Sequence, residues 1–162
     1  MKSQIFQDSL LLQLLLKEPT YYLMYPKYCD CFIISAIEGD GKWSPKKFEA
    51  FGKTFFDVSN VQNNAIYKWI YVLALPHEAK KFQVHVTIKN AMGETVNDYH
   101  EQARSMVESH DLIIEDERCF SLGIKKAKRY AMKDTNQVDY TVKIRNLKDE
   151  AKDEDEESGI DD

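Results

Sequence analysis

Apolar and polar positions follow clear patterns in the middle of the chain. Residues 66–74 are apolar or aromatic throughout except for Lys68, which predicts a strand with little solvent on either face. Residues 82–89 alternate between apolar and polar side chains, which predicts a strand with one buried and one exposed face. Residues 138–144 repeat that alternation near the end of the chain. These patterns favour an all-β sandwich in which residues 66–74 form a central strand.

Further strands are predicted on the N-terminal side. Residues 31–37 predict an apolar strand, and residues 38–42 contain two glycines that suit a hairpin turn. The next predicted strand, residues 43–47, contains Pro45, which has no amide hydrogen to donate to a neighbouring strand. We therefore expect this strand at a sheet edge or at a bulge. Residues 51–58 predict one more strand before the central one.

The remaining segments are assigned from local composition. Residues 95–109 fit either a helix or a strand that returns from the turn at residues 90–94, in which Gly93 takes the left-handed conformation. The other predictions are a loop at 59–64, a break between strands at 76–81, a loop at 111–118, a short strand at 119–122, a short helix at 124–132 and a turn at 134–137.

The composition predicts one domain followed by an acidic tail. The 162 residues, 43% of them hydrophobic, are enough for one sizeable core. Residues 148–162 hold nine acidic residues and two lysines, so they carry −7 and the rest of the chain carries +2. Such a tail has little to bury and should be disordered. We therefore expect a lead-in segment at residues 1–28, the sandwich at 29–147 and the tail at 148–162.

Residues 10–16 include six leucines and resemble the apolar core of a signal peptide. However, Lys2 is the only basic residue before them and no small-residue cleavage site follows. The run is also too short to span a bilayer, and it fits either a helix or a first strand. We expect no membrane partner and an intracellular protein, either cytoplasmic or nuclear.

The basic residues do not form the stripe that nucleic-acid binding requires. Four of them, Lys125, Lys126, Lys128 and Arg129, make a single short cluster. A cluster of this size is typical of a solvated protein face. We therefore expect no nucleic-acid partner.

The sequence contains no set of residues that dictates a reaction or a metal site. The three cysteines lack zinc-finger spacing, which suits a reduced intracellular chain, and we interpret Cys29 and Cys31 as small core residues on one strand face. The four histidines have no metal-ligand spacing to each other or to a cysteine, so no metal or cofactor is expected; they are His77, His85, His100 and His110. No nucleophile elbow or phosphate-binding loop supports an enzyme.

A series of short motifs runs through the chain in a definite order. Its parts are the strand at 32–37, the glycine turn, Trp43, Phe51 and Gly52 before Phe55, residues 79–82, residues 103–105, Cys119, the helix at 127–131 and the strand at 138–144. This series resembles the C-terminal, TRAF-like substrate-binding domain of the seven-in-absentia (Sina/Siah) ubiquitin ligases. The turn at 90–94 is similar to that of MATH domains, the sister branch of the same fold.

The resemblance implies a TRAF-like antiparallel β-sandwich of about eight strands with one or two short helices. It also implies a homodimer that binds an extended degron peptide beside an edge strand, by β-augmentation. Trp43 carries over from that family's peptide-binding strand, and Pro45 stands where the family has methionine. The family's RING and zinc-finger module needs a cysteine-rich stretch, which this sequence lacks. If the chain is complete, the resemblance implies an adaptor, a decoy or a truncated homologue.

The leading functional hypothesis is a protein-binding module with Trp43 and Pro45 as its candidate peptide-binding residues. Its partner would be a degron-like peptide or protein substrate. The alternative is a structural homodimer whose sandwich serves as an assembly unit, which the apolar residues at 10–16 and 21–25 would support. A sandwich-fold enzyme is a third alternative, because one fold can host many functions.

Overall fold

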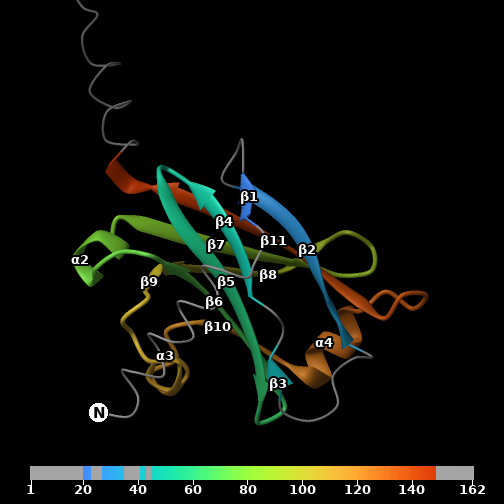
Figure 1. The fold of residues 1–162 in the computed structure, drawn as a ribbon. Coiled ribbons are helices and arrows are strands. Elements are labelled where there is room, and N and C mark those ends of the chain that lie inside the picture. The colour runs from blue at the N-terminus through green and yellow to red at the C-terminus, as the bar shows by residue number, and fades with distance from the viewer. Residues whose placement is uncertain (1–19, 23–26, 35–40, 43–44, 149–162) are drawn as a thin grey trace, which may run out of the picture.

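The computed structural model describes residues 20–22, 27–34, 41–42 and 45–148, which form two β-sheets around a shared core (Figure 1). The larger sheet contains β1 (Thr20–Tyr22), β3 (Gly41–Lys42), β4 (Lys46–Ala50), β5 (Lys53–Gln62), β6 (Ala65–Val72), β9 (Arg104–Ser105) and β10 (Phe120–Gly123). The smaller sheet contains β2 (Lys27–Ile33), β7 (Phe82–Lys89), β8 (Thr95–Gln102) and β11 (Gln137–Asn146). Three short helices are described, α2 (Pro76–Ala79), α3 (His110–Glu115) and α4 (Ile124–Tyr130).

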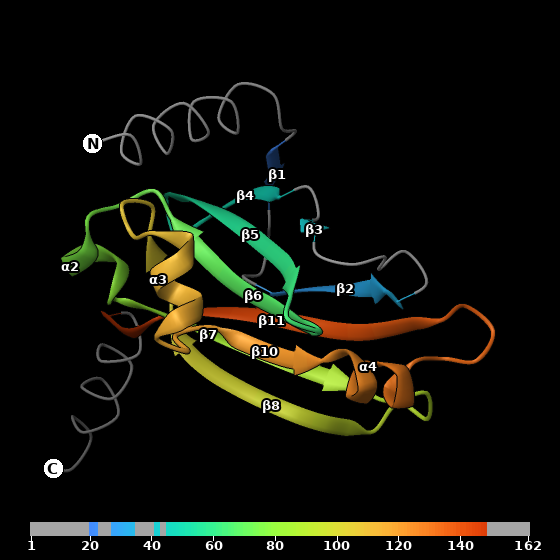
Figure 2. The same cartoon turned by 90° about the horizontal axis from the view of Figure 1, so that it is seen from below.

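The strand order confirms an all-β sandwich of mainly antiparallel strands. The larger sheet runs β1-β4-β5-β6-β10, with β3 paired to β5 and β9 paired to β6, and the smaller sheet runs β2-β11-β7-β8. Two short pairings, β1 with β4 and β6 with β9, are parallel. Figure 2 shows the two sheets from below, with α3 beside β5 and β6 and α4 beyond the end of β10. No helix among the described residues is long and apolar enough to cross a membrane.

β6 is the central strand that the sequence predicts. It pairs with β5 along one side and with β10 and β9 along the other. Ile66, Ile70 and Val72 pack into the core between the sheets, whereas Trp69 and Tyr71 pack in a second cluster that includes residues of α3. Both faces of β6 are therefore covered, which explains why its sequence is apolar at nearly every position.

β7 and β11 confirm the predicted alternation. The apolar positions of both strands are buried in the core, and the residues between them lie on the outer face of the smaller sheet. The buried residues are Phe82, Val84, Val86 and Ile88 in β7, and Val138, Tyr140, Val142 and Ile144 in β11.

A hairpin turn lies at each end of β5. Phe51 and Gly52 both have positive φ, and so do Asn63 and Asn64, which is the backbone of a turn that matches the twist of the flanking strands. The strand between them continues to Gln62, so the predicted loop at 59–64 was wrong apart from Asn63 and Asn64. The ladder to β6 satisfies the backbone of these polar residues and holds Ser59 and Asn60 in buried positions.

The second half of the chain contains one further correction. Residues 95–109 resolve as the returning strand β8 followed by β9, and Gly93 has the predicted positive φ, at +78°. The loop predicted at 111–118 was wrong, because residues 110–115 form α3. Ile113 and Ile114 pack there against the outer cluster of β5 and β6. Packing of this kind, rather than local propensity, stabilises such a short helix. The helix predicted at 124–132 is confirmed by α4.

Pro45 lies in an interruption between β3 and β4. Lys42 pairs with Asn60 and Lys46 pairs with Asp57, so this strand has one more residue than β5 over the same stretch. One extra residue is the definition of a bulge, where a proline is tolerated. β4 itself is not an edge strand, because β1 pairs with its other side.

Several sequence predictions fall outside the described residues. They concern Trp43, the leucine-rich run at 10–16, part of the aromatic stretch at 21–25, residues 35–40 of the predicted strand and turn, and the acidic tail after Lys148. The sandwich also includes β1 and the first two residues of β2, which precede the boundary expected at residue 29.

Candidate functional site

A pocket of about 330 Å³ opens between the smaller sheet and the β4–β5 hairpin of the larger sheet. Four consecutive residues of β2 line it, so the pocket follows the backbone of that strand. Its lining is Asp30, Cys31, Phe32 and Ile33 from β2, Lys46 and two residues of β5, Asp57 and Ser59, and Tyr140 from β11. Pro45, one of the two predicted peptide-binding residues, is half-buried directly before Lys46.

Among the described residues, no strand pairs with the edge of β2 that lies beside this pocket, and we call it the free edge. Within the described part of the chain β2 pairs only with β11. The Ile34 amide donates to the Asn136 carbonyl at 3.0 Å, and because hydrogen-bonded pairs alternate along an antiparallel ladder, the backbone groups of Cys29, Cys31 and Ile33 point away from β11. The Cys31 amide donates instead to Asp30 Oδ1 at 2.8 Å. Ile33 is 42% exposed at this edge.

The cysteines of β2 are not the core residues that the sequence predicts. Cys29 is exposed and Cys31 is half-buried, whereas Cys119, directly before β10, is buried. Phe32 takes the inward position between the sheets, so the alternate residues of β2 face outward. Cys29 Sγ lies 3.5 Å from Thr141 Oγ1 on that outer face.

A buried polar network lies beneath the pocket. Lys68, the exception in the apolar central strand, forms an ion pair with Asp57 and donates to Ser59 Oγ at 3.3 Å and to Tyr140 Oη at 3.2 Å. The Tyr28 hydroxyl donates to the second carboxylate oxygen of Asp57. The side chains of Lys68 and Asp57 are only 0% and 3% exposed.

Burial governs the protonation of this network. It lowers the pKa of Lys68, against the opposing effect of the Asp57 charge, and it raises the pKa of Tyr28 and of Tyr140, to which the Asp57 charge also contributes. A lysine with a lowered pKa is a candidate nucleophile. Here, however, the ammonium is fully buried and shared among three acceptors. The network therefore supports the sandwich and presents Asp57, Ser59 and Tyr140 as a polar floor to the pocket.

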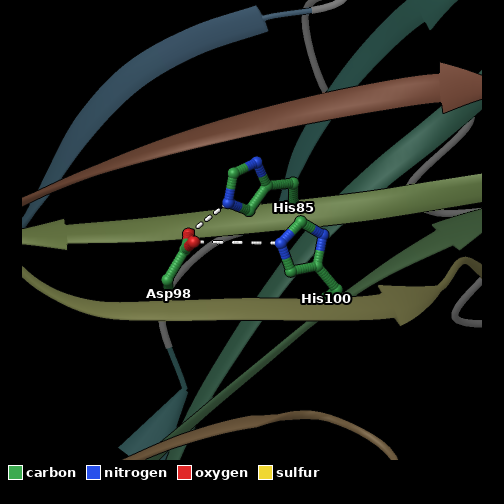
Figure 3. Close-up of side chains that lie close together, drawn as sticks. All are labelled: His85, Asp98 and His100. Carbon is green, nitrogen blue, oxygen red and sulfur yellow. Dashed lines mark hydrogen bonds and ion pairs between the residues drawn. The ribbon is translucent and has the colours of Figure 1, made fainter.

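A second polar cluster lies on the outer face of the smaller sheet, on β7 and β8 (Figure 3). His85 and His100 face each other across the two strands, and their rings stack with centroids 4.0 Å apart. Asp98 is hydrogen-bonded to His85 Nε2, and its other oxygen is 3.8 Å from His100 Nε2. Thr87 Oγ1 donates to Asp98 Oδ1 at 3.3 Å. The donor atoms of the two histidines and Asp98 all lie within 4.8 Å of one another.

Sequence reasoning missed this cluster because it compared positions along the chain. The signal that could have found it is the alternation of β7, which places His85 and Thr87 on the outer face, together with the hairpin that returns Asp98 and His100 beside them. Choosing the strand alternative for residues 95–109 would have brought the three side chains together. The other two histidines lie elsewhere: His77 is exposed on α2, and His110 packs on Trp69 and Tyr71.

No model of a known protein family matches the chain, and no curated protein matches it either. The resemblance to the seven-in-absentia domains therefore stays a prediction. Function has to be argued from the geometry of the pocket, the free edge and the histidine cluster.

Proposed function

We propose that this chain is a protein-binding module that receives an extended peptide along β2, similar in role to the substrate-recognition domain of the Sina/Siah ligases. The observation that carries the proposal is the pocket that follows the free edge of β2. A strand edge with unpaired backbone groups accepts another strand readily, and an adjacent pocket gives such an addition its side-chain preference.

The lining of the pocket indicates what the peptide should contain. Phe32 and Ile33 suit an apolar side chain, and the hydroxyls of Ser59 and Tyr140 suit a hydrogen-bonding group beside it. Lys46 and Asp30 form an ion pair at the rim, so the rim has no strong net charge. We infer an uncharged or weakly charged degron-like segment with an apolar anchor, rather than a strongly acidic or basic one.

The cellular role follows from the resemblance and is part of the same proposal. In that role the module would bind a substrate inside the cell for a ubiquitin ligase. Pro45 sits next to the pocket, and Trp43 is two residues before it in the sequence. Both residues are therefore candidates for contact with the peptide.

Peptide display on the purified chain, followed by fluorescence anisotropy with the selected peptides, tests the proposal. Ile33→Asp should weaken binding at least tenfold, because it places a charge on the free edge. Trp43→Ala should weaken binding by about 2 kcal/mol or more if the tryptophan is an anchor. Leu112→Asp is the matched control, since Leu112 is 51% exposed on α3, outside the pocket lining. Equal losses in all three variants, or no selected peptide, would contradict the proposal.

The second candidate is an assembly unit in which a copy of this chain covers the free edges. β2 and β8 are the outer strands of the smaller sheet, and within the described residues each has one strand neighbour. An eight-residue edge such as β8 can pair with its equivalent in a second copy. Sedimentation across micromolar concentrations distinguishes the two candidates, because a monomer that still binds peptides leaves only the first.

A further inference from the structure

We propose that His85, Asp98 and His100 bind a divalent first-row transition metal, with Zn²⁺ as the favoured ion, on the outer face of the smaller sheet. The proposal is independent of peptide binding, because β2 and its pocket lie at the opposite edge of that sheet. It rests on three observations: the register that brings the ligands together, the chemistry of their donor atoms and the hydroxyl that orients the carboxylate.

The β7–β8 register places the three side chains around one point of the surface. His85 is directly opposite His100, and Asp98 is two residues before His100 on the same strand (Figure 3). The Ala103 amide donates to the Phe82 carbonyl, and counting along the ladder from that pair makes His85 and His100 a non-hydrogen-bonded pair. Side chains approach most closely at such pairs, which agrees with the 4.0 Å ring separation.

The distances are close to those of a metal centre. A tetrahedral ion with bonds of about 2.0–2.1 Å holds its ligand atoms about 3.3 Å apart. The ligand atoms lie within 4.8 Å of one another, and rotation of exposed side chains can bring the wider pairs together and open the direct contact between His85 and Asp98. The backbone of the hairpin need not move, since β8 is already paired in register with β7, and β7 is paired with β11 on its other side.

Two imidazoles and one carboxylate form a donor set that suits zinc and its neighbours among the transition metals. The Asp98 carboxylate supplies the oxygen donor of this set, and its hydrogen bond with His85 already holds it beside the imidazole ring. Thr87 donates to the same carboxylate oxygen that faces His85, as an outer hydrogen-bond partner that fixes a metal ligand. The side chains of Asp98 and His100 are 53% and 48% exposed, which leaves room for water as a fourth ligand.

One neighbouring positive charge should repel a bound metal ion. Lys143 of β11 is paired directly with His85, so its side chain shares the outer face. Its ammonium should weaken metal binding by mutual repulsion, although solvent reduces that effect at an exposed site. Lys143→Gln should therefore tighten the binding by about two- to fivefold, whereas a substitution that merely loosens the surface would not tighten it.

Isothermal titration of the full chain with ZnCl₂ tests the proposal. We expect one ion per chain, and we expect His100→Ala or Asp98→Ala to weaken binding by about 100-fold or more, since even an outer hydrogen-bond partner contributes about 10- to 100-fold. Thr87→Ala should weaken it by about tenfold. His77→Ala is the control for histidine number, because His77 is an exposed histidine on α2, and it should bind like the wild type.

Two double variants test whether other residues of the chain bind the ion in place of the histidine cluster. Cys29→Ser combined with Cys31→Ser should retain the site, and Co²⁺ bound to the wild-type chain should show no thiolate-to-cobalt charge-transfer band. His85→Ala combined with His100→Ala should lose the site while the acidic tail remains. Retention of full affinity in that double histidine variant, or its loss in the cysteine variant, would overturn the proposal. No binding to the wild-type chain would identify the cluster as a surface ion pair only.

Discussion

The two polar clusters of this domain have similar parts and opposite surroundings. Lys68 and Asp57 lie between the sheets, with side chains 0% and 3% exposed, whereas His85 and Asp98 lie on the outer face, 24% and 53% exposed. Each pair joins neighbouring strands and each has a hydroxyl beside it. In the buried cluster, protein groups must supply every partner, because water is excluded. In the exposed cluster, water can replace any hydrogen-bond partner, so these side chains can exchange one partner for another.

The comparison shows that a buried ion pair and an exposed one restrict a sheet differently. Desolvation of the buried pair offsets much of its attraction, so its net contribution to stability is small, but the loss of either partner leaves a charge without compensation. The exposed pair contributes little to stability, so its removal should change the free energy of unfolding only slightly. The first therefore limits which residues the fold accepts, and the second leaves the surface open for a function such as metal binding.

Removal of one partner from the buried cluster should have the largest effect. Asp57→Ala should lower the free energy of unfolding by about 3–5 kcal/mol, because it leaves the Lys68 ammonium buried without its counter-charge. Asp57→Leu combined with Lys68→Met should recover most of that loss, since it removes both charges. Urea unfolding of the single and double variants provides the measurement. A single-variant loss below about 1 kcal/mol would mean that water reaches the network.

Loss of the hydroxyl that completes the network should have an intermediate effect. Tyr28→Phe removes the donor to the second oxygen of Asp57 and keeps the ring, so it should cost about 1–3 kcal/mol. Tyr67→Phe, at a half-buried tyrosine on the other face of β6, is the control and should change stability less. Equal effects would show that the hydroxyl of Tyr28 contributes nothing beyond that of an ordinary tyrosine.

The buried tyrosine hydroxyls should also make the stability of the domain depend on alkaline pH. Burial raises the pKa of Tyr28, Tyr71, Tyr99 and Tyr140, while tyrosine in an unfolded chain ionises near pH 10. The unfolded state therefore loses these protons first, and stability present below about pH 10 should fall as pH rises, by up to about 1.4 kcal/mol per pH unit for each tyrosine.

Lys68 acts in the opposite direction over part of this range. Its lowered pKa makes the unfolded state bind more protons below about pH 10.4, so its contribution to stability rises with pH there. Urea unfolding between about pH 9 and 11 should still show a net fall, because four tyrosines outweigh one lysine. Tyr140→Phe should make the free energy of unfolding fall less steeply with pH. An unchanged slope in this variant would contradict a raised pKa for Tyr140.

Disruption of the exposed pair should have the smallest effect on stability. Asp98→Asn removes the charge that faces His85 and His100, and we expect the melting temperature in the absence of metal to stay within about two degrees of the wild-type value, because solvent screens such pairs. The same variant should lose the Zn²⁺-dependent rise in melting temperature that we expect of the wild-type chain. A large drop without metal would mean that the cluster holds the hairpin together.

Strands with an unambiguous side-chain period could be predicted from the amino-acid sequence alone. Which strand faces are buried followed from two patterns, because a strand has only two faces. These patterns are the alternation in residues 82–89 and 138–144 and the nearly uniform apolar run at 66–74. The sequence also placed Lys68 in a buried strand and Pro45 at an irregular position. These are local properties, and the residues that cause them lie within a few positions of each other.

Contacts between residues far apart in the sequence depend on how the strands pair and pack. The register of β5 against β6 places Asp57 within reach of Lys68, and the same ladder turned a predicted loop into the end of β5. α3 forms where Ile113 and Ile114 find an apolar surface on β5 and β6. The histidine cluster depends on the pairing of β7 with β8, because a shift of one residue would move His100 to the opposite face of the sheet. Periodicity gives the face of a side chain, whereas its partners depend on the register and on the order of strands in the sheet.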